Sequence, residues 1–317
     1  MSTWDATTKE GVRRRYEEAL ELFVTRVKQD RSIVAAILYG SLAYDEVWEK
    51  SDIDIMLIGR DDKTTDRFYV LVENGITLHA QVIPRSKFKA GVEGNLQGVW
   101  TQSVMARSRL LFSTDESIQE YYENVHHVGS RDREMHILGA ASSVISLLTK
   151  AEKWLVVKND PVYSFTYLVH LMHSLAEIEV LWHAAVPGRE VIQQALAYNP
   201  GFFTALYTDL ARGPKDAETM RWAIQQVYAY LDERRGVIFK PILRYLSAVG
   251  SVRSASEIED YLQQRSHIGG LSVMCEWLAD RGVLQQVATP LRLTEKSRVT
   301  MDEAAYYYDG DDNDDTH

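Results

Sequence analysis

The chain has 317 residues, of which 45% are hydrophobic and 25% charged, and its formal net charge is −10 at pH 7. This composition is typical of a soluble globular protein with two or three domains. The single cysteine, Cys275, excludes an internal disulfide framework and a cysteine-based zinc cluster. The acidic balance gives no general attraction to a nucleic-acid backbone. The sequence shows neither a signal core nor an apolar run of ~18 residues, so a cytoplasmic protein without a membrane span is expected.

Residues 1–125 predict a small domain of strands and helices. Amphipathic spacing indicates a helix over 7–30, and residues 65–74 fit either a helix or a strand. The other expected elements are strands at 33–39, 53–58 and 76–83, a helix at 85–92, a short apolar segment at 108–113 and a helix at 115–124 capped by Thr114 and Asp115.

The segment Tyr39–Leu57 contains the residues most typical of a chemical site. Gly40 and Ser41 end the first apolar strand, and Asp52 and Asp54 open the second. Two carboxylates at i and i+2 on a strand share a face, because strand side chains alternate. Such acids need a partner, and a divalent cation suits oxygen ligands. A Gly-Ser turn offers backbone N–H groups and a hydroxyl to a phosphate.

This arrangement resembles the nucleotidyltransferase superfamily, which includes DNA polymerase β and the aminoglycoside and lincosamide nucleotidyltransferases. The resemblance covers about residues 30–85 and rests on Gly40, Ser41, Asp52 and Asp54. It implies an α+β domain with a mixed sheet, in which Asp52 and Asp54 bind Mg²⁺ or Mn²⁺ and Gly40 and Ser41 bind the phosphates of a nucleoside triphosphate.

The family usually places a third acid on a neighbouring strand, as a metal ligand or general base. The corresponding segment here, in the strand at 76–83, carries His79 and Gln81 on one face, and neither is an acid. A histidine can ligate a metal or accept a proton, but it brings no negative charge to hold magnesium. His79 is therefore either the base of an active enzyme or a sign that the site binds nucleotide without turnover. A third alternative is a solvent-exposed strand histidine without a role in the site.

Residues 130–248 predict an α-helical bundle. Long helices are expected from Arg131 to about 157, from Asp160 and Pro161 onward, and from 217 to about 246 with a kink or break at Pro241. In the second helix, His170, His173 and Glu177 share one face, so Glu177 is a candidate substitute acid with Glu179 as an alternative. Apolar neighbours also fit partly buried, satisfied histidines.

Residues 252–308 resemble a winged-helix module, reached through a linker at 251–255. Its expected parts are helices at 256–263 and 268–280 and a hairpin with Ala288, Thr289 and Pro290 at the tip. The second helix carries Glu276 and Asp280 and no basic residue before Arg281, which argues against DNA binding. Residues 309–317 predict a disordered acidic tail.

The combined prediction is a metal-dependent nucleotidyltransferase that moves a nucleoside monophosphate from a triphosphate to a hydroxyl of a small molecule, aminoglycoside-like or lincosamide-like. The assigned roles are metal binding by Asp52 and Asp54, phosphate binding by Gly40 and Ser41, and proton removal by His79 or Glu177. The interdomain cleft is the expected place for both substrates. The alternative is a catalytically degenerate nucleotide-binding regulator of the toxin–antitoxin kind. Family members often dimerise through their helical parts, so a homodimer is compatible with this prediction.

Overall fold

The computed structural model describes residues 9–94, 105, 108–125, 130–263, 270–294 and 298–310. Two compact units divide the chain, residues 1–129 and 130–317. Within the described ranges, every helix is too short or too polar to cross a lipid bilayer.

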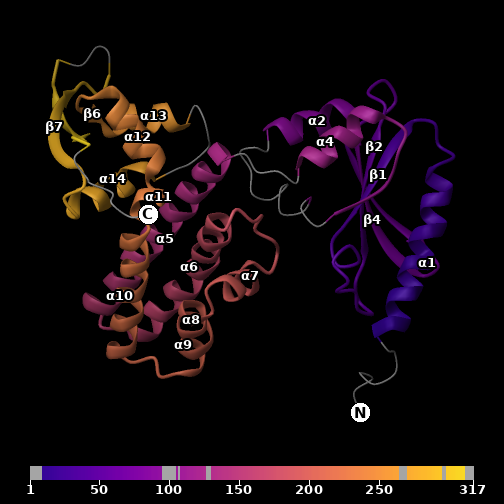
Figure 1. Ribbon diagram of the computed structural model, residues 1–317, viewed down its shortest axis with the longest axis horizontal. Coiled ribbons are helices and arrows are strands. Elements are labelled where there is room, and N and C mark those ends of the chain that lie inside the picture. Colours follow the sequence, from indigo (N-terminus) through magenta and orange to yellow (C-terminus); the bar gives the residue numbers. More distant parts are fainter. Residues whose placement is uncertain are drawn as a thin grey trace. The chain divides into compact units, whose positions relative to one another are not determined.

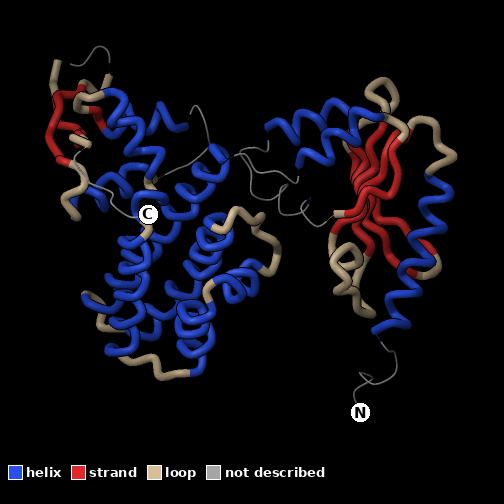
Figure 2. Tube along the Cα trace, viewed as in Figure 1, coloured by secondary structure: helices blue, strands red, loops and turns tan. Residues whose placement is uncertain are grey.

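A five-stranded mixed sheet forms the centre of the first unit (Figures 1 and 2). The strands are β1 (Ile33–Tyr39), β2 (Ile53–Gly59), β3 (Arg67–Glu73), β4 (Ile76–Pro84) and β5 (Arg109–Ser113). Their order across the sheet is β3-β4-β2-β1-β5, with β2 and β4 parallel and the other pairs antiparallel. Residues 67–73 are a strand, not a helix. Asn74 and Gly75, with φ of 49° and 75°, form the tight turn that pairs β3 with β4.

Helices cover both faces of this sheet. Helix α1 (Lys9–Val27) packs on one face against Ile53, Ile55 and Leu57 of β2. Helices α2 (Arg85–Gly94) and α4 (Glu116–Val125) pack on the other, against Met56 and Ile58 (Figure 1). Strand β2 is buried on both sides, which explains its nearly continuous apolar sequence. The polar residues at its start, Asp52 and Asp54, therefore stand out from the core pattern.

The second unit begins with a helical array. Its helices are α5 (Ser130–Val156), α6 (Pro161–Trp182), α7 (Val191–Tyr198), α8 (Pro200–Phe203), the π-helix at Thr204–Asp209, α9 (Leu210–Arg212), α10 (Ala217–Glu233), α11 (Arg235–Ile238) and α12 (Lys240–Val249). Helix α6 begins as predicted: Pro161 is in its first turn, and the Asp160 carboxylate accepts a hydrogen bond of 2.9 Å from the Tyr163 backbone N–H.

The predicted helix from 217 to about 246 is present in three pieces: the break expected near Pro241 is found, and a second break at Arg234 was not expected. The helix is interrupted at Arg234 and again at Phe239, and Pro241 lies in the first turn of α12. A proline lacks the N–H of the helical ladder and its ring clashes with the carbonyl four residues earlier, so the helix restarts just before it.

The chain ends in α13 (Ala255–Gln263), α14 (Leu271–Asp280) and a three-stranded antiparallel sheet ordered β6-β8-β7. Two predictions are corrected here. The expected linker at 251–255 contains strand β6 (Arg253–Ser254), which pairs with β8 (Met301–Tyr307). Ala288, Thr289 and Pro290 lie inside β7 (Gln285–Leu291), not at a hairpin tip. A proline is tolerated there because β7 is an edge strand. The acidic tail, from residue 311 on, lies outside the described residues.

Candidate metal and nucleotide site

The turn after β1 lies directly against the Asp54 carboxylate. Gly40 has φ of 76°, a conformation that side chains disfavour, and a Cβ built on it would lie 2.2 Å from Asp54 Oδ2. The chain then turns back: the Gly40 carbonyl accepts from Ala43 N–H at 3.0 Å, and the Ser41 carbonyl from Glu46 N–H at 2.9 Å. Within the described part of the chain, the buried Ser41 Oγ has no hydrogen-bond partner. Glycine is therefore required here by both conformation and space.

The sheet register brings Asp54 and His79 together. Four residues form one row across four strands: Val70 on β3, His79 on β4, Asp54 on β2 and Tyr39 on β1. Asp52 precedes β2 and shares the face of Asp54, because side chains alternate along the strand. The histidine at the position where the family usually has an acid thus lies beside the carboxylate pair.

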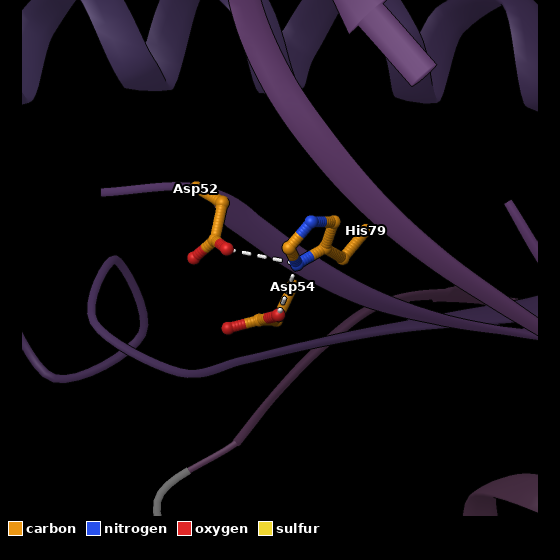
Figure 3. A group of neighbouring side chains, drawn as sticks. All are labelled: Asp52, Asp54 and His79. Carbon is orange, nitrogen blue, oxygen red and sulfur yellow. Dashed lines mark ion pairs between the residues drawn. The ribbon is translucent and has the colours of Figure 1, made fainter. Parts of the chain in front are cut away.

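Three side chains converge at this point (Figure 3). His79 Nδ1 is 2.8 Å from Asp52 Oδ2 and 3.6 Å from Asp54 Oδ1. One potential ligand atom from each residue lies within 4.8 Å of the other two. The side chains are 40%, 22% and 31% exposed for Asp52, Asp54 and His79, so the cluster is open to a ligand.

The donor set fits a divalent cation. Two carboxylates balance the charge of one such ion, and carboxylate oxygens are the ligands that magnesium, calcium and manganese prefer. The imidazole shifts the preference away from magnesium and toward transition metals. The metal-binding roles of Asp52 and Asp54 stay predictions, as do the phosphate-binding roles of Gly40 and Ser41.

Two tyrosines support the cluster and were missed at the level of sequence. Tyr39 is next to Asp54 in the row, and burial together with the nearby charges of Asp54 and Asp52 raises its pKa to about 12. It is therefore a neutral hydroxyl at physiological pH. Tyr16 of α1 is buried and donates a 2.7 Å hydrogen bond to the Ser51 carbonyl, which fixes the backbone just before Asp52. Both contacts join segments that are distant in the sequence, so only the folded structure reveals them.

The acids proposed in the helical region have different surroundings. Glu177 lies on α6 of the second unit, where its carboxylate is 3.6 Å from His173 Nδ1 and burial raises its pKa. Glu179 is 2% exposed and accepts a 2.8 Å hydrogen bond from the Tyr230 hydroxyl. Glu179 is thus a structural carboxylate, while Glu177 stays a predicted proton acceptor.

Comparisons with known proteins agree with this fold. Residues 24–117 match the family described as "Polymerase beta, Nucleotidyltransferase". Among solved structures, a nucleotidyltransferase-like protein from Exiguobacterium sibiricum aligns with a TM-score of 0.61 and 14% identity, covering 92% of this chain and 99% of that one. No curated protein sequence matches significantly.

The mixed sheet, the Gly-Ser turn and the adjacent carboxylate pair define the first unit as a nucleotidyl-transfer type of fold with an Asp-Asp-His cluster. Residues 24–117 belong to the nucleotidyltransferase superfamily.

Proposed function

We propose that the protein is a metal-dependent nucleotidyltransferase that moves a nucleoside monophosphate to a hydroxyl of a small molecule. The observation that carries this proposal is the convergence of Asp52, Asp54 and His79 beside the Gly40–Ser41 turn. A divalent metal bound there, Mg²⁺ or Mn²⁺, would neutralise triphosphate charge and orient the phosphorus for in-line attack.

The residues of the chain have separate tasks in this reaction. Asp52 and Asp54 would hold the cation, and the turn at Gly40 and Ser41 would hold the leaving phosphates. The acceptor oxygen forms a bond to the α-phosphorus while the bond to the β-phosphate oxygen breaks and pyrophosphate leaves. The acceptor proton passes to His79. In Figure 3 the Nε2 side of the His79 ring faces away from both carboxylates, which leaves that nitrogen for the proton.

Aminoglycoside-like and lincosamide-like compounds are the acceptors to test first. The protein is incubated with each labelled nucleoside triphosphate, Mg²⁺ or Mn²⁺, and a panel of both compound types. We expect label transfer that is lost in Asp52→Ala and Asp54→Ala. Asp62→Ala is the matched control, because Asp62 is an exposed acid beyond the other end of β2. Absence of transfer to every acceptor would contradict the proposal.

A second function is a nucleotide-binding regulator descended from such enzymes. The imidazole at the position of the usual third acid favours it, since it removes one negative charge from the metal site. Metal-dependent nucleotide binding without transfer would support this second function.

We also propose that residues 252–308 form a winged-helix-like domain that shares its hydrophobic core with the helical bundle at 130–248. The chain order β6, α13, α14 and the β7–β8 pair supports this assignment. The acids Glu276 and Asp280 on α14 favour a packing or substrate-covering role over DNA binding.

A further inference from the structure

Three large apolar side chains stand exposed on the edge strand next to the candidate site. Phe68, Val70 and Val72 of β3 are 59%, 62% and 68% exposed. They alternate along the strand and therefore share one face. This set, the β3 stripe, adjoins His79: Val70 is its register partner, and the Phe68 ring centroid is 5.4 Å from that of the imidazole.

The opposite face of β3 behaves differently. Leu71 packs against the core under α1, and the charged residues Arg67 and Glu73 fall on that same side by alternation. The β3 stripe thus presents apolar groups without a charge among them. Contiguous exposed apolar groups on an edge strand invite aggregation, and where proteins keep them they commonly mark binding surfaces.

The strand order places the β3 stripe on the far side of His79 from the Gly40–Ser41 turn. Across the sheet, the Gly40–Ser41 turn follows β1, Asp54 is on β2, His79 on β4 and the β3 stripe on β3. In an in-line displacement the attacking oxygen enters opposite the leaving group. In the proposed function, pyrophosphate lies at the turn and the transferred phosphorus at the Asp pair, which directs the acceptor hydroxyl to the β4 side. The body of the acceptor then lies over β3.

We propose that the β3 stripe binds the acceptor, and that the acceptor is a hydroxyl compound with a flat apolar or aromatic face. The inference rests on the proposed function and narrows its range of acceptors. The β3 stripe offers no carboxylate to a polycationic acceptor. An aromatic group, in contrast, gains contact with the ring of Phe68 and the branched side chains of Val70 and Val72. The reaction itself is unchanged, with the acceptor hydroxyl attacking the α-phosphorus, pyrophosphate leaving and the proton passing to His79 Nε2.

Equilibrium binding tests the stripe without requiring turnover. The probes are phenyl and methyl glycosides of the same sugars, titrated calorimetrically into the full chain with Mn²⁺ and an α,β-methylene nucleoside triphosphate, which resists transfer. The variants are Phe68→Ser and Val70→Ser. Tyr69→Ser is the matched control, because Tyr69 is an exposed aromatic on the same strand but on the opposite face.

We expect the phenyl glycosides to bind about tenfold more tightly than their methyl partners, and this preference to fall below about twofold in both stripe variants but to persist in Tyr69→Ser. Equal binding of phenyl and methyl glycosides by the wild type would overturn the inference, as would an equal loss in Tyr69→Ser. If the stripe variants change only the sedimentation of the protein, a second copy covers the stripe and the inference is also wrong. Binding of the nucleotide analogue is measured separately. If the wild type does not bind this analogue, the proposed function is refuted and not only the role of the β3 stripe.

Discussion

Replacing Gly40 by alanine tests whether the turn and the Asp54 carboxylate form one structural unit. The added Cβ would lie 2.2 Å from Asp54 Oδ2 and 3.1 Å from Asp54 Cγ. Ordinary contacts of a Cβ begin at 3.4 Å, so the carboxylate oxygen has to move by more than about 1 Å. A shift of this size in a metal ligand is expected to lower metal affinity by about tenfold to a hundredfold. The positive φ adds a backbone cost of about 1–2 kcal/mol in the free energy of unfolding.

Gly75→Ala separates these two effects. Gly75 has φ of 75°, almost that of Gly40, but a Cβ there meets nothing within 4 Å. Both variants should therefore lose similar stability in urea unfolding, while only Gly40→Ala loses Mn²⁺ affinity in calorimetric titration. Wild-type metal affinity in Gly40→Ala, or an equal loss of affinity in Gly75→Ala, would show that contact with Asp54 is not what the glycine provides.

Three further outcomes are expected. Tyr16→Phe leaves the Ser51 carbonyl without its 2.7 Å hydrogen-bond donor, so the free energy of unfolding should fall by about 1–3 kcal/mol. Mn²⁺ affinity should also fall, whereas a purely structural role of Tyr16 would leave it unchanged. His79→Asp places a third acid beside the pair, so in EDTA the variant should melt below the wild type, but its affinity for Mg²⁺ should rise relative to Mn²⁺; an unchanged metal preference would exclude His79 from the site. The Asp115 carboxylate accepts from Ser117 and Arg85, which lowers its pKa to about 2. Its stabilising effect is therefore complete above the ordinary value near 4 and lost as pH falls through about 2. In thermal melts Asp115→Ala should be destabilised relative to the wild type at pH 6, and most of this difference should disappear at pH 2.

Much of the first unit could be predicted because its patterns are local. Strands β1, β2 and β4 follow continuous or alternating apolar runs, and the i, i+2 spacing alone is enough to put Asp52 and Asp54 on one face. The sequence of strand β3 fits a helix as well as a strand, because its apolar residues are not confined to one face. Its exposed Phe68, Val70 and Val72 interrupt the usual apolar-in, polar-out alternation, so only the Asn74–Gly75 turn and pairing with β4 define it.

The remaining features depend on contacts between distant segments. The proximity of His79 to Asp54 follows from the β2–β4 register, which no spacing within one segment encodes. The two-residue strand β6 exists only because β8 pairs with it, and Pro290 is accepted in β7 only because that strand has a free edge. Tyr16 reaches the backbone before Asp52 from a helix 35 residues earlier.

The imidazole between the two carboxylates has a consequence for the state without substrate. Three carboxylates gathered this closely would repel one another until a cation arrived. Here His79 Nδ1 already contacts both Asp52 and Asp54, so the resting protein holds its ligands in place by itself. A cation would then enter a site whose two carboxylates are already in place.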